Sequence, residues 1–172
     1  MKKTLKEKRT VMTLGLVVDD DRILLGMKKR GFGKGYWNGF GGKLHFGETL
    51  YEGMKRELHE ETSLLMIGAE RSAFLEFFFE DGMILEGNVF LITEFSGIAV
   101  ETDEMSPQWF YIKEIPYHSM WEDDLYWMPH VLNRKKVAAS FSFTSGHKLA
   151  GKKVSIVSDE NFFKEYSEQS HL

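Results

Sequence analysis

Residues 42–64 read GKLHFGETLYEGMKRELHEETSL, and this stretch predicts a loop followed by an amphipathic helix. Thr49 is a favourable helix N-cap, and Glu52, three residues later, completes the pattern of a capping box. Apolar residues recur at every fourth position from Leu50 to Leu58, which indicates one buried stripe along the helix. The helix is therefore expected to pack on a core and to expose its other face.

Three glutamates lie on that other face. Glu57, Glu60 and Glu61 stand at i, i+3 and i+4, so their carboxylates are neighbours on a helix. Like charges at this spacing repel, and a hard cation such as Mg²⁺ or Mn²⁺ removes the repulsion because it prefers oxygen ligands. Arg56 and Glu48 are expected to pair beside the cluster and hold it. The alternative is a solvated acidic face, which the three glutamates alone do not exclude.

The rest of the chain alternates strand-like segments with two further helices. The glycine-rich segment 31–47 is expected to be irregular, because glycine at this density disfavours regular elements. Pro129 is placed near the first turn of the second helix. We expect one α+β domain over residues 1–172, with residues 1–9 flexible. Strands are expected at 11–18, 22–27, 64–79, 83–95, 108–112, 138–144 and 148–157, and helices at 50–62, at 125–136 and from residue 159.

Composition excludes several classes of protein. The net charge of −4 gives no basic footprint for a nucleic-acid polymer. The chain has no cysteine, so disulfide frameworks, thiolate zinc sites and cysteine nucleophiles are excluded, and a cytoplasmic location is expected. The apolar run 11–18 is too short to cross a membrane and is followed by three aspartates, so it is assigned to a strand rather than to a secretion signal.

The quoted stretch resembles the Nudix box. That pattern requires glycine, glutamate, Arg-Glu, an aliphatic residue, Glu-Glu and a further aliphatic residue at fixed spacing. It is matched in register by Gly42, Glu48, Arg56, Glu57, Leu58, Glu60, Glu61 and Leu64. Ser63 stands where the pattern has a glycine that ends the helix. If the helix ends there in a left-handed conformation, the serine costs about 1 kcal/mol.

Outside the box, several strings resemble the branch of the Nudix family that hydrolyses oxidised purine nucleoside triphosphates. They are GMKKRGFG at 26–33, WNGFGGK at 37–43, ETDEM at 101–105 and MWEDDLYW at 120–127. The resemblance covers roughly residues 11–145 and fades in the tail after about residue 145. It implies a Nudix fold, an α/β/α sandwich around a mixed, partly barrel-like sheet.

The same resemblance implies a metal site and a reaction. Glu57, Glu60 and Glu61 would bind Mg²⁺, with Mn²⁺ as a substitute, together with Glu104 and the carbonyl of Gly41. Water would attack a phosphorus atom and pyrophosphate would leave. Glu60 or Glu104 would take the proton, and Glu60 is favoured for the essential metal chemistry. Arg56 belongs with the catalytic set, and Lys43 is a candidate contact to phosphate oxygens.

A pocket for the base is implied as well. In it, Asn38, Asp123 and Asp124 would hydrogen-bond the purine edge and Trp121 would stack on its face. Two adjacent carboxyls in an apolar pocket cannot both ionise cheaply, so the pair would exchange a proton and read purine edges of different pattern. The alternative assigns both aspartates to a turn and a helix N-cap. Residues expected nearby are Thr13, Lys28, Phe32 and Trp127.

One strand of the pocket is ambiguous. Leu75, Phe77, Phe78 and Phe79 allow more than one register, and a shift by one residue turns every side chain to the other face. We assign Phe77 and, on the opposing strand, Leu85 to the base pocket.

The function predicted is hydrolysis of 8-oxo-dGTP and 2-oxo-dATP to the monophosphate and pyrophosphate, by a monomer whose partner is a small nucleotide. Two alternatives remain. One is a Nudix pyrophosphatase for an unmodified dNTP, a nucleotide sugar or a dinucleoside polyphosphate. The other is a non-catalytic module that binds nucleotides or RNA, against which the intact glutamates argue.

Overall fold

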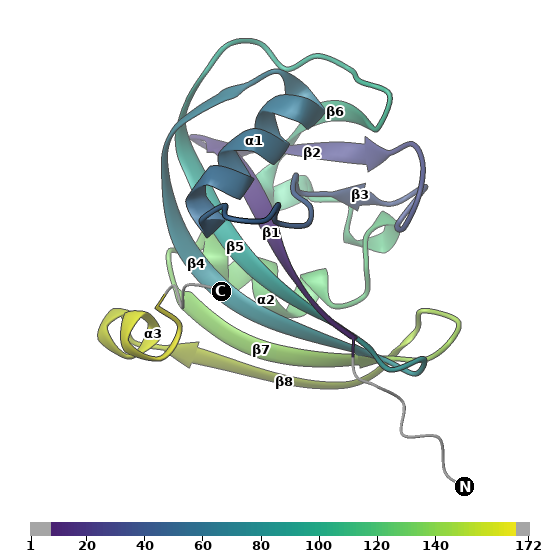
Figure 1. Cartoon of the computed structure of the whole chain (residues 1–172). Coiled ribbons are helices and arrows are strands. Elements are labelled where there is room, and N and C mark those ends of the chain that lie inside the picture. Colours follow the sequence, from purple (N-terminus) through teal and green to yellow (C-terminus); the bar gives the residue numbers. More distant parts are fainter. Residues whose placement is uncertain (1–7, 168–172) are drawn as a thin grey trace, which may run out of the picture.

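The structure is a computed structural model, and it describes residues 8–167. A mixed, eight-stranded sheet forms its centre (Figure 1). In chain order the elements are β1 (Lys8–Asp19), β2 (Arg22–Lys28), β3 (Trp37–Asn38), α1 (Leu50–Thr62), β4 (Leu65–Phe79), β5 (Met83–Ser96), β6 (Met105–Tyr111), the 3₁₀ turns η1 (Ile112–Glu114) and η2 (Tyr117–Ser119), α2 (Asp124–Leu132), β7 (Lys136–Phe143), β8 (Leu149–Val157) and α3 (Asp159–Glu165).

The strands run in the order β3-β2-β1-β5-β4-β7-β8, and β6 pairs with β2. The pairs β1/β5 and β4/β7 are parallel and the others are antiparallel. The sheet is strongly curved but does not close into a barrel, because β8 and β3 end the path without pairing to each other.

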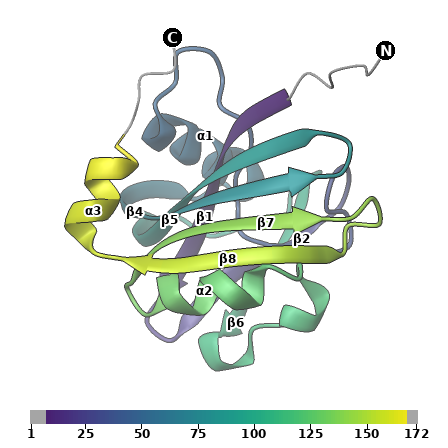
Figure 2. The ribbon, with the colours of Figure 1, turned by 90° about the horizontal axis from the view of Figure 1, so that it is seen from below.

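Helices cover both faces of the sheet. Seen from below, α1 and α2 lie on opposite sides of the strands, which makes the predicted α/β/α sandwich (Figure 2). The third helix, α3, packs on β7, where Lys136 lies near Phe162 on the side of the strand away from α2. Within residues 8–167 no helix is long and apolar enough to cross a membrane.

The acidic helix forms as its sequence predicts. The hydroxyl of Thr49 accepts a hydrogen bond from the backbone of Glu52, and the Glu52 carboxylate accepts one from the backbone of Thr49. Leu50, Met54 and Leu58 are buried against the sheet. The helix ends at Thr62, after which Ser63 adopts a left-handed conformation with φ of 67°.

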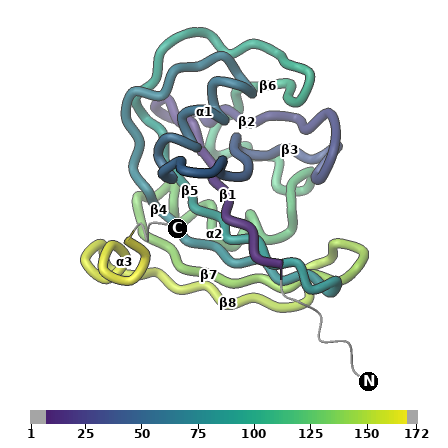
Figure 3. The backbone as a smooth tube through the Cα atoms, in the orientation of Figure 1, coloured from purple at the N-terminus to yellow at the C-terminus, as the bar shows by residue number. Residues whose placement is uncertain are grey.

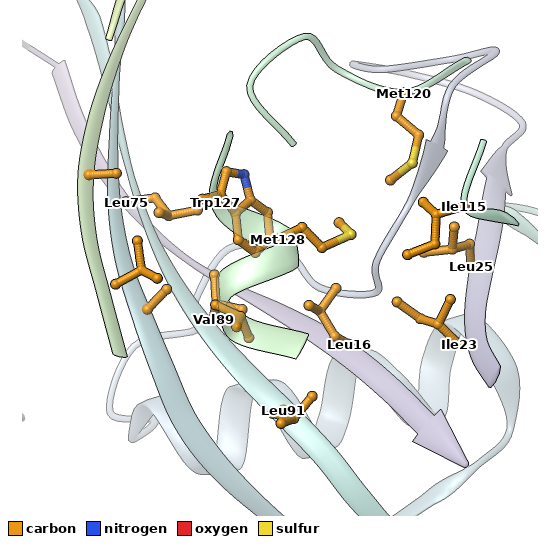
Figure 4. Close-up of a cluster of buried hydrophobic side chains, with 14 of the residues drawn as sticks. Leu16, Ile23, Leu25, Leu75, Val89, Leu91, Ile115, Met120, Trp127 and Met128 are labelled. Carbon is orange, nitrogen blue, oxygen red and sulfur yellow. The ribbon is translucent and has the colours of Figure 1, made fainter. Parts of the chain in front are cut away.

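The largest core cluster lies between the sheet and α2. Figure 4 shows Trp127 of α2 pointing toward Leu75 of β4, while Met128 extends the other way, toward the side of Leu25 and Ile115. A second cluster, which includes Leu50, lies under α1 on the other face. Burial on both faces explains why the central strands are apolar on both sides.

The N-terminal residues and β6 differ from the sequence prediction. Residues 8 and 9 are not flexible, because β1 begins at Lys8 and continues the ladder with β5; residues 1–7 lie outside the described part. The strand predicted at 108–112 begins earlier, at Met105. Its Pro107 is tolerated because β6 pairs with β2 alone and is an edge strand.

The second helix is shorter than predicted. It ends at Leu132, and Arg134 follows with φ of 60°, so Lys136 belongs to β7 and not to the helix. Pro129 lies in the interior of α2 rather than near its first turn.

The segment between β2 and α1 is mostly irregular, and the backbone trace in Figure 3 shows it running beside β1. Within it β3 pairs with β2, and isolated bridges join Gly15 to Phe40 and Met12 to Lys43. Gly41 has to be a glycine because a Cβ there would lie 1.9 Å from the Thr13 carbonyl oxygen. The loop is therefore bound along β1.

The left-handed Ser63 predicts a stabilising substitution. Ser63→Gly removes the steric cost of positive φ and should raise the free energy of unfolding by about 1 kcal/mol, which is about 2–4 °C in Tm for a domain of this size. Thermal unfolding of the two proteins measures the difference. Ser63→Ala keeps the Cβ and is the matched control, and an equal gain from alanine would contradict the explanation.

Candidate active site

Arg56 is the centre of the charged face of α1. Its guanidinium donates to Glu57 at 2.8 Å and to Glu60 at 3.2 Å. It also donates to Glu48 at 2.5 Å and to the carbonyl of Lys43 at 3.1 Å. The arginine therefore ties the helix to the loop before it and neutralises part of the acidic cluster.

The predicted pairing of Glu48 with Arg56 is present. The Arg56 guanidinium lowers the pKa of the Glu48 carboxyl to about 2, and the backbone N–H of His45 adds to this effect. Glu48 is thus ionised at any ordinary pH. Gly42 leaves room for the cluster, because a Cβ there would lie 2.6 Å from the Glu57 carboxylate.

Glu61 has a different environment from the other glutamates of α1. It is 2% exposed, one carboxylate oxygen accepts from the backbone of Gly41 at 2.8 Å, and the other, Oε2, is buried without a hydrogen-bond partner. Burial raises the pKa of Glu61 to about 8, although the Gly41 N–H and the charge of Lys28 act in the opposite direction.

The loop that carries Glu104 is tied to the same place. The hydroxyl of Thr102 donates to the backbone carbonyl of Glu61 at 3.2 Å. The Glu104 carboxylate lies 3.2 Å from Arg30 and 4.0 Å from Lys28. Glu104 therefore lies beside Glu61, although it comes from a distant segment of the chain. Its negative charge contributes to the raised pKa of the Glu61 carboxyl.

The donor set fits a hard divalent cation. All candidate ligand atoms are oxygens, and the unpartnered Oε2 of Glu61 is an orphaned acceptor that a cation would satisfy. Among the described residues, however, no three carboxylates are already gathered in ligand geometry. Glu57 and Glu60 are bound by Arg56 instead, so their side chains have to turn to bind a metal.

A cavity of about 860 Å³, its open mouth included, adjoins this cluster. Gly41 and Lys28 line it, so the acidic helix and the cavity share a border. Every residue that the sequence assigned to the base pocket lines the cavity except Trp127. The nine assigned residues that line the cavity are Thr13, Lys28, Phe32, Asn38, Phe77, Leu85, Trp121, Asp123 and Asp124.

Two adjacent carboxyls lie on the wall of this cavity. Asp123 is 3% exposed and Asp124 is 6% exposed. Burial raises the pKa of Asp123 to about 6, and burial together with the charge of Asp123 raises the pKa of Asp124 well above its usual range. Asp123 is the N-cap residue of α2, yet its side chain makes no capping hydrogen bond. A capping role therefore does not explain why an aspartate stands at this position.

Trp127 lies behind the pair and not in the pocket. Its ring is fully buried in the core, and its indole N–H donates to the Asp123 carboxylate at 2.9 Å. The prediction that Trp127 lies near the base is therefore wrong. Trp127 follows Asp123 by one helical turn and points into the core, because α2 packs on β7.

The β4 register is settled by strand pairing. Phe77 is opposite Leu85 and beside Phe141, and both Phe77 and Leu85 face the cavity. Phe78 points to the other face and is exposed.

Trp121 belongs to a group of packed rings that line the cavity, which we call the aromatic wall; its other members are Phe32, Phe79 and Phe143. Its ring centroid lies 5.1 Å from Phe32 in a stacked arrangement, 5.4 Å from Tyr36 and 5.7 Å from Phe143. His147 also contacts Trp121 with a centroid separation of 5.4 Å.

Sequence reasoning did not assign Tyr36, Phe79, Phe143 or His147 to the site. Phe79 could have been found from the alternation that follows Phe77, whereas Phe143 reaches the site through the pairing of β7 with β4 and His147 has no local signal. Lys43 is exposed, and only its backbone carbonyl contacts the cluster.

The NUDIX domain family model matches residues 6–131. The chain belongs to the Nudix family. It is 44% identical over 138 residues to the oxidized purine nucleoside triphosphate hydrolase of Danio rerio, a match that covers 80% of this chain and 88% of that protein. It is also 44% identical over 132 residues to the Mus musculus protein of the same name, with 76% and 85% covered.

Among solved structures, the mutator MutT protein of Bacillus halodurans superposes with a TM-score of 0.77 at 27% identity, over 85% of this chain and 97% of that one. Nudix hydrolases generally use divalent metal ions, which agrees with the oxygen donors around α1.

Glu61 makes the stability of this Nudix protein depend on pH. Its pKa rises from 4.5 in the unfolded chain to about 8 in the fold, so the buried carboxyl imposes no cost below pH 4.5 and a growing cost as pH rises toward 8. Glu61→Gln removes this cost. In metal-free protein, the Tm of Glu61→Gln minus that of the unmodified chain should therefore increase between these two pH values.

Saturating Mg²⁺ should reduce that difference at the upper end, because a cation stabilises the protein that retains the Glu61 carboxylate more than the variant that has lost this ligand. Differential scanning fluorimetry across the pH range measures both effects. A Tm difference that does not change with pH would contradict the assignment of a raised pKa to Glu61.

Proposed function

We propose that this Nudix protein hydrolyses oxidised purine nucleoside triphosphates, 8-oxo-dGTP and 2-oxo-dATP, to the monophosphate and pyrophosphate with Mg²⁺. The observation that carries the proposal is one cavity whose lining combines two chemically different groups. Buried Asp123 and Asp124 form what we call the base end, and Gly41, hydrogen-bonded to Glu61, marks what we call the phosphate end. The names of the relatives from Danio rerio and Mus musculus agree with this reading.

The base end is suited to a flat heterocycle with several polar atoms. Asn38 offers an amide, and the two aspartates offer carboxyls whose raised pKa values favour one shared proton. A protonated carboxyl donates and an ionised one accepts, so moving the proton reverses the pattern. The pair therefore accommodates both an 8-oxoguanine edge and a 2-oxoadenine edge, while Trp121 supplies a stacking face.

The phosphate end holds the proposed metal ligands. Glu57, Glu60 and Glu61 of α1, Glu104 and the Gly41 carbonyl would hold Mg²⁺, which neutralises polyphosphate charge and lowers the pKa of water when bound. Arg56 holds Glu57 and Glu60 near each other despite their repulsion. Lys28 lines the cavity near Glu104, where its ammonium can meet a phosphate oxygen.

Proton transfer is assigned to the exposed glutamates. Hydrolysis breaks the bond between the α- and β-phosphates, water supplies the new oxygen, and its proton passes to a carboxylate. Glu60 is 55% exposed and Glu104 is 46% exposed, so both reach the open side of the site. We favour Glu60, because it belongs to the rigid helix that also carries Glu57 and Glu61.

The proposal also treats residues 1–172 as one Nudix domain acting as a monomer. The strands β7 and β8 lie beyond the matched residues 6–131, yet they extend the same sheet, and Phe143 lines the cavity.

Pyrophosphate release tests the function. With Mg²⁺, kcat/KM for 8-oxo-dGTP and 2-oxo-dATP should exceed that for dGTP by about tenfold or more, because dGTP cannot satisfy the buried polar groups in the same way. Glu60→Gln should lower kcat by about a hundredfold or more. Glu160→Gln, on exposed α3, is the matched control and should retain full activity.

Equal rates for oxidised and unmodified nucleotides would indicate a general nucleotide pyrophosphatase and would overturn the role given to the base end. If none of the three nucleotides releases pyrophosphate, the proposed function is wrong. A nucleotide sugar or a dinucleoside polyphosphate would then be the substrate to test, or the protein would bind a nucleotide without cleaving it.

The aspartate pair makes a separate prediction. Asp124→Asn replaces a carboxyl that can gain or lose a proton by an amide that cannot. The ratio of kcat/KM values for 8-oxo-dGTP and 2-oxo-dATP should therefore change by about tenfold, since one edge loses a matched partner. Parallel assays on the two substrates measure the ratio. An equal loss for both would mean that Asp124 supports the fold without reading the base.

A further inference from the structure

His147 contacts three rings that come from three different segments. Its imidazole centroid lies 5.4 Å from Phe32, 5.4 Å from Trp121 and 6.0 Å from Phe79. Phe32 belongs to the loop after β2, Trp121 precedes α2, and Phe79 ends β4. His147 itself does not line the cavity, whereas all three of these rings do.

The turn between β7 and β8 carries the imidazole to this place. Phe143 is paired with Phe79, so the end of β7 lies beside the end of β4, and Figure 1 shows this turn at the same end of the sheet as the turn between β4 and β5. His147 adopts φ of 57°, and its backbone N–H donates to the Thr144 carbonyl at 2.9 Å. The backbone of Ser145 donates to Glu80, which ties the two turns together.

An exposed histidine on a hairpin turn ordinarily extends into solvent. The side chain of the neighbouring Lys148 does extend outward, and it pairs with Glu122 at the surface. His147 instead turns toward the aromatic wall despite its left-handed backbone. Aromatic contacts of this kind stabilise the paired rings beyond the effect of the area they bury.

We propose that His147 is a positioning residue for the purine-stacking surface: its ring holds Phe32, Phe79 and Trp121 in one wall before the nucleotide arrives. The proposal rests on the proposed function in so far as the ligand is an oxidised purine nucleotide. The physical effect is preorganisation, because a wall whose rings are already ordered loses less conformational freedom on binding. His147 acts through Trp121 and Phe32, so it influences binding of the base more than chemistry at the phosphates.

Three variants separate the ring from the turn. His147→Asn removes the ring but keeps a residue that tolerates positive φ. His147→Phe retains an aromatic ring, and Ser145→Ala is a control in the same turn. Isothermal titration with 8-oxo-dGMP measures Kd, and steady-state assays with 8-oxo-dGTP measure KM and kcat.

His147→Asn should raise Kd and KM by about three- to tenfold and leave kcat within about twofold. His147→Phe should restore Kd to within about twofold of the unmodified protein, and Ser145→Ala should leave it unchanged. Unchanged Kd in His147→Asn overturns the proposal. So does a loss of affinity in Ser145→Ala as large as that in His147→Asn, because the turn and not the ring contact would then be the cause.

A spectroscopic readout keeps this test independent of the proposed function. The indole N–H signal of Trp121, assigned with Trp121→Phe, should shift or broaden in nucleotide-free His147→Asn, while that of buried Trp127 stays in place. If the unmodified chain neither binds nor cleaves oxidised nucleotides, the proposed function fails, and the indole signal alone decides the role of His147. An unchanged Trp121 signal would overturn that role.

Discussion

Crowding of carboxylates on α1 is the constraint on which the site depends. Glu57, Glu60 and Glu61 cannot share one face without a counter-charge, and Arg56 supplies it for the first two. Glu61 is left in an apolar place with an unpartnered oxygen and a raised pKa. The helix tolerates this because its capping box and apolar stripe anchor it independently of the charges. The apolar face thus stabilises the helix, and the charged residues of α1 include the proposed metal ligands.

Buried carboxyls also occur at the base end of the cavity. Burial raises the pKa of Asp123 and Asp124 as it does that of Glu61. At α1 the desolvated carboxyl is suited to a cation, since it has an unpartnered oxygen and the carboxylates of Glu57 and Glu104 act on it. At α2 the desolvated pair is suited to a hydrogen-bonding base, since aromatic rings and an amide surround it. The indole of Trp127 holds Asp123 from the core side, so the orientation of that carboxyl is set by packing.

Much of the site could be predicted from the sequence, because its strongest elements are local. Capping, the apolar stripe and the carboxylate face of α1 follow from spacings of three and four residues, and the left-handed end at Ser63 follows from the box. The nine cavity residues were identified through resemblance. The wrong predictions concern features that depend on contacts with distant segments. β6 begins earlier than predicted because β2 pairs with it, and Trp127 faces the core because α2 packs on β7.

By itself, the sequence determined the acidic helix, the Nudix resemblance and the types of residue at both ends of the site, since these are properties of short periodic segments. Only the tertiary structure decided which carboxyls are buried, which face Phe77 takes, and that His147 meets Trp121 and Phe32. Desolvation and ring contacts arise between segments that are far apart in the chain. Strand pairing brings those segments together, and no local pattern encodes the resulting distances.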